Sequence, residues 1–380
     1  MRKRLCAALC AALLCATLGM PARAAERAPE TSAAATAVMH VETGALLHAE
    51  NADTPMRIAS TTKIMTALVV LEHCDPGEPV EILPEYTAVE GSSMYLRAGE
   101  TYTVQELLYG MMLASGNDAA TALACHTAGS IEAFAALMNE KAAALGLTNT
   151  SFRNPHGLDA EGHLSTARDL AALACCAMQN EAFREIVSTA SKTIHGQTYV
   201  NHNRLLRSYA GAIGVKTGYT EAAGRILVSC AQRGDTRFVC VTISDRNDWE
   251  DHARLLDWAF DSYEYRAVIP ADAAYPVAVL SGAAAQCDAV PRETVRLLLE
   301  KDARTETRIE LPRFVFAPVR QGDALGLLTV TAADGTTAQT PLVCAQDVAA
   351  DANARLTPRE RLERFWNLAG HYLFSFYPGN

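Results

Sequence analysis

The chain has 380 residues and a formal net charge of -10 at pH 7, with 49% hydrophobic and 20% charged residues. The length suits one large domain followed by a smaller one, and the ordinary apolar content with scattered charge indicates a globular protein. The acidic balance argues against nucleic acid as a partner.

The first 24 residues carry the features of a secretory signal peptide. Arg2, Lys3 and Arg4 precede an apolar run at residues 5–18, and Ala22-Arg23-Ala24 has the small-x-small pattern of a cleavage site. The apolar run is too short to span a bilayer. We therefore expect the mature protein to work outside the cytoplasm. Loss of the leader removes four basic residues and no acidic one, so the net charge changes from -10 to about -14.

Eleven cysteines are many for a secreted protein, but three of them leave with the leader. The other eight show neither a C-x-x-C pair nor a histidine-rich spacing that would indicate zinc. Those in apolar helical or strand-like stretches are expected to be small buried hydrophobic residues: Cys74, Cys125, Cys175, Cys176, Cys230 and Cys240. The compartment permits disulfides, and the sequence does not pair them.

The first expected elements of the mature chain are a β-hairpin at residues 36–41 and 45–49 and a helix that starts near Ser60. An apolar segment follows Lys63 and would end before Pro76. Ser60 and Lys63 would share one helical face, and the unpaired N–H groups of the first turn could stabilise an oxyanion. A lysine held neutral by burial and cationic neighbours can activate a serine hydroxyl. Ser-x-x-Lys is nevertheless common by chance, and a serine N-cap before an ordinary amphipathic helix remains an alternative.

Further helices are expected from Thr103, where Glu106 completes a capping box, and on both sides of Ser115-Gly116-Asn117. A hydroxyl and an amide at a helix junction suit a loop that faces a cleft. The alternative is a plain helix break with Asn117 or Asp118 as an N-cap. Helices are also predicted at residues 130–145 and 166–178, with turn sequence at 152–159 between them.

Three antiparallel strands are predicted after the last of these helices. Lys216-Thr217-Gly218 begins or lies on the first strand, and residues 224–231 and 237–243 form the next two.

Ser60-Thr61-Thr62-Lys63, Ser115-Gly116-Asn117 and Lys216-Thr217-Gly218 resemble, in order and spacing, the three motifs of the penicillin-recognising serine enzymes. Their surroundings resemble one branch, the D-alanyl-D-alanine carboxypeptidases of peptidase family S11, which are low-molecular-mass penicillin-binding proteins. The resembling segments include residues 154–159, 165–170 and 258–260, and the match covers residues 35–262. The resemblance implies an α/β fold: a β-lactamase/transpeptidase-like domain with an antiparallel sheet flanked by helices. It implies no metal and no organic cofactor.

The resemblance also implies a role for each motif residue. Ser60 would attack the peptide bond between the two terminal D-alanines of a peptidoglycan pentapeptide, with Lys63 as general base. Ser115 would relay a proton to the leaving D-alanine, and Asn117 would bind the substrate amide. The Ser60 N–H and a strand N–H after Gly218 would form the oxyanion hole. β-Lactams would acylate the same serine.

The remaining expected substrate contacts involve carboxylate recognition. Lys216 would keep Lys63 neutral and attract the terminal carboxylate, and Thr217 and Gly218 would recognise that carboxylate and the substrate backbone. Arg246 resembles a family arginine near the same carboxylate; a solvated loop arginine is the alternative.

Two other functions stay open from the sequence. A β-lactamase needs a carboxylate that activates water, and no convincing equivalent is present, since Gly116 stands where those enzymes commonly carry aspartate. A non-catalytic peptidoglycan-binding module would not need the complete set of catalytic side chains.

The predicted domains are a signal peptide at 1–24, a peptidase domain at 25–264, a small all-β domain at 265–352 and a tail at 353–380. Residues beyond 267 form short alternating or β-branched stretches, at 267–280, 295–299, 307–311, 314–319, 326–331 and 337–343. This region carries no catalytic constellation, so a spacer or partner-binding role is expected.

The tail has apolar residues at helical spacing: Leu362, Phe365, Trp366, Ala369, Tyr372, Leu373 and Phe376. Basic residues cluster at its start, although Glu360 and Glu363 weaken attraction to anionic lipid. An interfacial helix that holds the enzyme at the outer face of the cytoplasmic membrane is expected, and packing on the β domain is the alternative.

Overall fold

The computed structural model describes residues 27–351, 357–360, 362, 363 and 366. The expected leader, residues 1–24, lies outside these residues, as does most of the tail. The described chain divides into two compact units, with the boundary between Ser262 and Tyr263.

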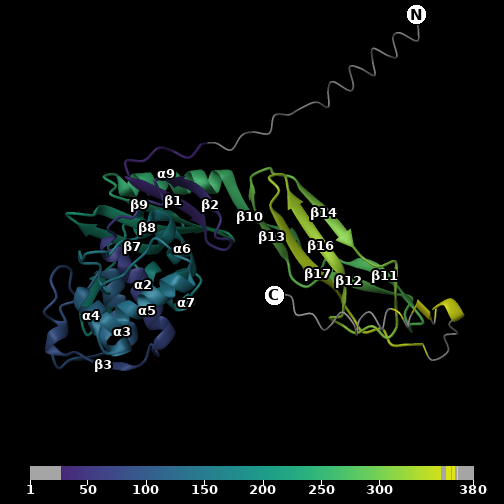
Figure 1. Ribbon diagram of the computed structural model, residues 1–380, viewed down its shortest axis with the longest axis horizontal. Coiled ribbons are helices and arrows are strands. Elements are labelled where there is room, and N and C mark those ends of the chain that lie inside the picture. Colours follow the sequence, from purple (N-terminus) through teal and green to yellow (C-terminus); the bar gives the residue numbers. More distant parts are fainter. Residues whose placement is uncertain (1–26, 352–356, 361, 364–365, 367–380) are drawn as a thin grey trace, which may run out of the picture. The chain divides into compact units, whose positions relative to one another are not determined.

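An antiparallel sheet of five strands organises the first unit (Figure 1). Its strand order is β2-β1-β9-β8-β7. The strands are β1 (Ala35–His40), β2 (Leu46–Glu50), β7 (Ala212–Thr220), β8 (Gly224–Arg233) and β9 (Thr236–Ile243). Both the predicted hairpin and the predicted run of three strands are confirmed by this pairing.

Helices cover both faces of this sheet, as Figure 1 shows for α6 (Ala167–Ala177) on one side and α9 (Asp248–Ser262) on the other. Helix α6 packs against β1 and β9, while α9 packs against β8 and β9. A strand covered on both sides has no solvent face, and β9 accordingly reads as a nearly continuous apolar run instead of alternating.

Helix α2 (Lys63–His73) lies at the centre of the helical layer and contacts α3, α4, α5, α6 and α7. It is buried from Lys63 to Val70 because neighbours surround it, and its sequence is apolar on all sides. The other helices are α3 (Val104–Leu113), α4 (Asn117–Ala128), α5 (Ile131–Ala144), α7 (Glu181–Ser188) and α8 (Leu205–Ser208), with 3-10 turns η1 (Ala59–Thr62) and η2 (Pro84–Tyr86).

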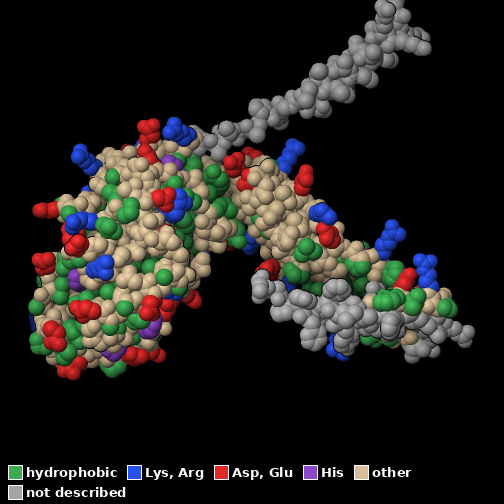
Figure 2. Space-filling model, viewed as in Figure 1, with side chains coloured by type: hydrophobic (Ala, Val, Ile, Leu, Met, Phe, Trp, Pro, Cys, Tyr) green, Lys and Arg blue, Asp and Glu red, His purple; other side chains and the backbone are tan. Residues whose placement is uncertain are grey.

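Two small hairpins complete the first unit: β3 (Pro79–Glu81) with β4 (Thr101–Thr103), and β5 (Ser191–Ile194) with β6 (Gln197–Val200). The predicted capping box at Thr103 is present, since the Glu106 N–H donates to the Thr103 hydroxyl and the Thr103 N–H donates to the Glu106 carboxylate. Figure 2 shows acidic and basic side chains side by side over the upper part of the visible face of this unit, and mainly acidic ones over its lower part.

The second unit is all β, as expected. A two-stranded sheet pairs β10 with β13, and a six-stranded sheet has the order β14-β16-β17-β12-β11-β15. The strands are β10 (Tyr263–Ile269), β11 (Tyr275–Leu280), β12 (Gln286–Pro291), β13 (Val295–Glu300), β14 (Thr305–Glu310), β15 (Phe314–Phe316), β16 (Ala324–Ala332) and β17 (Thr337–Cys344). Strand β12 was not predicted, because Asp288 and Pro291 resemble turn residues and the pattern is short.

Candidate active site

Ser60 lies in the tight turn η1 that leads into α2. The residue before it, Ala59, has a left-handed backbone with φ +44°. A non-glycine residue in this region is strained and persists only where its surroundings fix it, which is common at functional sites. The Thr62 hydroxyl helps to fix the turn by donating a hydrogen bond of 2.8 Å to the Ala59 carbonyl.

Lys63 begins α2, and its side chain is fully buried. The Lys63 Nζ lies 3.0 Å from the Ser60 Oγ, 2.7 Å from the Asn117 Oδ1 and 2.8 Å from the His156 carbonyl oxygen. A neutral amine has two N–H donors and one lone pair. The amide and carbonyl oxygens can only accept, so they take both N–H groups. The lone pair is then left for the Ser60 hydroxyl, which donates to it.

The electrostatic surroundings favour this neutral form of Lys63. Burial is the largest influence and holds its pKa well below the ordinary value for lysine, and the nearby positive charge of Lys216 lowers it further. Asp118 acts in the opposite direction and raises it. The predicted closeness of Lys63 and Lys216 is therefore consistent with the structure, in which burial also lowers the pKa of Lys216 to about 7.

Ser115, Gly116 and Asn117 form the junction between α3 and α4. Ser115 is buried and has a left-handed backbone with φ +62°. Asn117 begins α4, and its Nδ2 donates to the Glu90 carbonyl, which orients the Oδ1 toward Lys63. A Cβ on Gly116 would lie 2.8 Å from the Asp118 carboxylate and 3.1 Å from the Met94 backbone N, so only glycine fits without displacement.

Asp118, for which the sequence indicates no role beyond that of an N-cap, anchors the loop before α3. Its buried carboxylate accepts hydrogen bonds from the Ser93 hydroxyl and from the backbone N–H groups of Met94 and Leu96. The adjacent Asn117 N–H donates to the Ser92 carbonyl. Two neighbouring residues thus fix this loop beside the site.

The loop at residues 154–157 supplies backbone groups that the sequence did not reveal. The His156 carbonyl binds Lys63, and the Pro155 carbonyl accepts from the Thr66 hydroxyl of α2. Gly157, with φ +87°, approaches so closely that an added Cβ would lie 1.9 Å from the Ala59 carbonyl oxygen. This loop therefore packs directly on the turn that carries Ser60.

The buried His163 also holds the turn η1 in place, through Thr62. The Arg153 N–H donates to the His163 Nδ1, so the proton of the neutral ring lies on Nε2 and is donated to the Thr62 Oγ1, 2.8 Å away. The Thr62 hydroxyl in turn donates to the Ala59 carbonyl. Burial lowers the pKa of His163 to about 4, so the ring is neutral at physiological pH.

Thr217 and Gly218 follow Lys216 on β7, which packs against η1. A Cβ on Gly218 would lie 3.1 Å from the Ile58 carbonyl oxygen and 3.3 Å from the Thr61 N. The glycine therefore permits the close approach of the strand to the nucleophile turn. This places the Lys216-Thr217-Gly218 motif next to Ser60.

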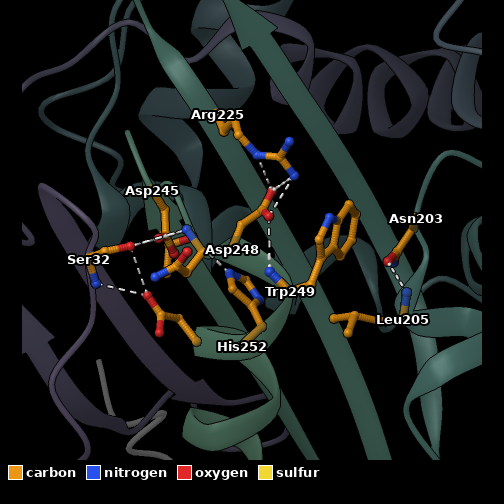
Figure 3. Close-up of polar contacts among 11 residues, drawn as sticks. Ser32, Asn203, Leu205, Arg225, Asp245, Asp248, Trp249 and His252 are labelled. Carbon is orange, nitrogen blue, oxygen red and sulfur yellow. Dashed lines mark hydrogen bonds and ion pairs between the residues drawn. The ribbon is translucent and has the colours of Figure 1, made fainter.

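Arg246 lies exposed in the loop between β9 and α9, and within the described part of the chain no hydrogen bond or ion pair joins it to the residues around Ser60. Its neighbours in the chain are anchored (Figure 3). Asp245 accepts from the Ser32 hydroxyl, and Asp248 forms a paired hydrogen bond with Arg225. The loop is thus held at both ends, while its arginine side chain projects into solvent.

A profile of the peptidase S11 family, described as D-alanyl-D-alanine carboxypeptidase, matches residues 22–247. The chain belongs to this family. The relatives of this S11 enzyme include the D-alanyl-D-alanine carboxypeptidase DacF of Bacillus subtilis, which is 33% identical over 345 residues, 86% of this chain and 88% of DacF. DacC of Escherichia coli is 32% identical and covers 84% of this chain and 85% of DacC. The expected family and enzyme class are confirmed.

Solved structures support the same assignment for both units of the S11 enzyme. Penicillin-binding protein 5 from Haemophilus influenzae is 28% identical with a TM-score of 0.69, covering 85% of this chain and 99% of that structure. The carboxypeptidase DacD from Francisella tularensis is 27% identical with a TM-score of 0.65, and the match covers 87% of this chain and 97% of that structure. The expected fold class is confirmed.

His163 offers a test of how the nucleophile turn is held. In the His163→Leu variant the Thr62 hydroxyl loses its donor and a buried group is left unpaired, so penicillin should acylate the protein about tenfold more slowly. His163→Gln keeps one acceptor and one donor and should recover most of the rate. The measurement is the acylation rate beside the thermal midpoint of each variant. Equal rates in both variants would contradict a role in positioning.

Proposed function

We propose that this S11 enzyme removes the terminal D-alanine from peptidoglycan pentapeptide stems through an acyl-enzyme on Ser60. The observation that carries this proposal is the environment of Lys63. Both of its N–H groups have acceptors in Asn117 and His156, and its lone pair faces the Ser60 hydroxyl. A serine at a strained turn that donates its proton to a buried base is an activated nucleophile.

In the first half of the reaction, the Ser60 Oγ attacks the carbonyl of the penultimate D-alanine while its proton passes to Lys63. The tetrahedral intermediate collapses, the bond to the terminal D-alanine breaks, and its amine takes a proton through Ser115. Water then attacks the ester, gives a proton back through the same groups and releases the shortened stem with Ser60 restored. N–H groups at Ser60 and after Gly218 would stabilise the oxyanion in both steps.

Lys216, Thr217 and Gly218 would bind the substrate carboxylate. Asn117 would form a hydrogen bond with the substrate amide. The closeness of β7 to η1 supports this carboxylate binding, since the lysine charge influences Lys63 across the same space. We keep Arg246 as a second partner for the carboxylate. It is exposed and belongs to an anchored loop, so its side chain can turn toward a substrate.

The charge of Lys216 should govern the pH dependence of acylation. Only neutral Lys63 can accept the Ser60 proton, so the rate should fall as the pH decreases through the lowered pKa of Lys63. In Lys216→Ala one cause of that lowering is absent, so this acidic limb should move to higher pH. Lys216→Arg keeps the charge and should leave the limb near its original position. Penicillin acylation rates measured across pH test this, and an unmoved limb in Lys216→Ala would contradict the coupling.

The activity itself is tested by incubating purified protein with a pentapeptide ending in D-alanyl-D-alanine. We expect stoichiometric release of free D-alanine and slow, long-lived acylation by penicillin. Rapid hydrolysis of nitrocefin would instead identify a β-lactamase. Substrate binding without D-alanine release would identify a non-catalytic module.

One similar solved protein, from Streptomyces K15, is named a DD-transpeptidase and is 36% identical with a TM-score of 0.59 over 61% of this chain. The acyl group on Ser60 could therefore be transferred to an amine instead of to water, and the two reactions can be compared directly. Adding glycine as an acceptor to the pentapeptide assay separates the two. We expect the tetrapeptide acid to remain the main product; a peptide extended by glycine would identify a transpeptidase.

We further propose that the enzyme is secreted and acts at the outer face of the cytoplasmic membrane. The leader at residues 1–24 supports secretion, with a peptidase domain at 25–264, a β domain at 265–352 and an anchoring tail at 353–380. Among the residues that the structure describes, no helix is both long and apolar enough to cross a bilayer. The described tail residues 358–360, 362, 363 and 366 are helical, and Leu362 and Trp366 are exposed.

The tail makes a testable contribution to localisation. Mature protein should float with anionic liposomes, because an apolar helical face inserts at the interface. A chain that ends at Thr357 should remain in the soluble fraction. Flotation of both forms to the same extent would rule out the anchor, and an unchanged thermal midpoint of the shortened chain serves as the folding control.

A further inference from the structure

Three side chains of types that commonly serve as metal ligands lie together at the end of the helical layer remote from Ser60. Cys74 caps the C-terminal end of α2, His126 lies in the last turn of α4, and Glu78 precedes β3. Their ligand atoms, one thiol sulfur, one imidazole nitrogen and one carboxylate oxygen, all lie within 4.8 Å of one another. The reaction proposed above uses none of these residues.

Neighbouring groups outside the cluster hold Glu78 and Cys74 in place, and His126 contacts Glu78. The Asp75 N–H donates to the Glu78 Oε1, which leaves the Glu78 Oε2 facing the His126 Nε2 at 3.1 Å. The Cys74 Sγ lies 3.3 Å from the Thr127 Oγ1. Because the Thr127 hydroxyl donates to the Leu123 carbonyl, its oxygen accepts the thiol proton. The backbone at Glu78 is also fixed, since its carbonyl accepts from the Val104 N–H.

The donor set selects the class of metal. Calcium and magnesium prefer all-oxygen surroundings, whereas a thiolate, an imidazole and a carboxylate together suit zinc. Zinc bound to three protein ligands keeps a fourth position for water. The His126 and Glu78 side chains are 27% and 45% exposed, so solvent can reach that position.

We propose that Cys74, Glu78 and His126 bind one Zn²⁺ ion, with water as the fourth ligand. Binding releases the Cys74 thiol proton to solvent, uses His126 as a neutral ligand and breaks the present contact of Glu78 with His126. The ion joins α2 and α4 at their C-terminal ends. Lys63 and Asn117, which contact each other, begin the same two helices.

The distance between this site and the catalytic residues indicates a structural role for the ion. Helix α2 has 11 residues, so Cys74 lies about 16 Å along the helix from Lys63. The ion is therefore too remote to touch substrate. It should stabilise the packing of α2 on α4, and this inference stands whether or not the proposed reaction is correct.

Cobalt provides the first probe, because Co²⁺ bound to a thiolate gives a near-ultraviolet charge-transfer band. Mature metal-free protein titrated with Co²⁺ under reducing conditions should develop this band at one equivalent, and Zn²⁺ should abolish it. Cys74→Ser should lose the band. Cys176→Ser, which changes a half-buried thiol in α6, is the matched control and should keep it.

Two further measurements locate the site. Zn²⁺ should protect Cys74, and not Cys176, from alkylation detected by mass spectrometry. His126→Gln and Glu78→Gln should each weaken Zn²⁺ binding about tenfold or more, measured against a chromophoric chelator. Zn²⁺ should also raise the thermal midpoint of the wild type but not of Cys74→Ser. No cobalt band in the wild type, or an equal band in Cys74→Ser, would overturn the proposal.

Discussion

Replacing Lys63 with alanine should slow acylation of Ser60 by penicillin by about four orders of magnitude or more, on the scale of removing the base from a serine protease triad. The physical reason is the lone pair that faces the Ser60 hydroxyl. Among the residues that the structure describes, Lys63 is the basic group that forms a hydrogen bond with the Ser60 Oγ. Stopped-flow or mass-spectrometric acylation rates measure the loss.

The control for this variant must separate chemistry from packing. Lys63→Ala also removes the donor to Asn117 and His156, so a structural cause has to be examined. Asn117→Asp keeps an acceptor beside Lys63 but adds a negative charge, which should raise the pKa of Lys63 and move the acidic limb of the rate profile upward. A Lys63→Ala variant that acylates at a rate close to the wild type would refute the role of the lysine as base.

Gly157→Ala should be the most damaging substitution at a residue that carries no functional side chain. The new Cβ would lie 1.9 Å from the Ala59 carbonyl oxygen and 2.9 Å from the Thr62 Oγ1, while the backbone has φ +87°. The left-handed conformation and the steric overlap together should cost about 3 kcal/mol or more of unfolding free energy. The displaced nucleophile turn should lower the acylation rate about a hundredfold, because small misplacements of reacting atoms are costly.

Gly146→Ala separates the two causes. Gly146 also has a positive φ of +70°, but an added Cβ there would meet nothing within 4 Å. It should therefore show only the conformational cost of about 1–2 kcal/mol and acylate normally. Urea unfolding and acylation rates of the two variants measure the difference. If Gly157→Ala behaved like Gly146→Ala, the close packing on Ala59 would have no functional consequence.

The chemistry-bearing side chains could be predicted from the sequence because each motif is contiguous, and two of the three motifs lie at the start of a helix or between two helices, while Lys216-Thr217-Gly218 lies within β7. Ser60 and Lys63 lie in η1 and at the start of α2, and Ser115 and Asn117 lie at the junction of two helices whose patterns are clear. The central strands of the sheet were also predictable, since β8 and β9 are apolar runs separated by Gly234 and Asp235. These features depend only on local sequence.

What the sequence could not predict depends on backbone groups and long-range contacts. The His156 carbonyl is a partner of Lys63, but any residue carries a carbonyl, so no residue type marks it. Thr62 and His163 are 101 residues apart, and their contact arises only when the chain folds. The same holds for Cys74 and His126, whose sequence spacing does not resemble a metal motif although the fold brings them together.

The most direct test of the central claim is to locate the acyl group after penicillin labelling of the mature protein. Trypsin should release the peptide Ile58-Ala59-Ser60-Thr61-Thr62-Lys63, and fragmentation can distinguish Ser60 from the two adjacent threonines. We predict a single penicilloyl adduct on Ser60, and none in Ser60→Ala. An adduct on any other residue, or labelling that persists in Ser60→Ala, would contradict the assignment of Ser60 as the nucleophile.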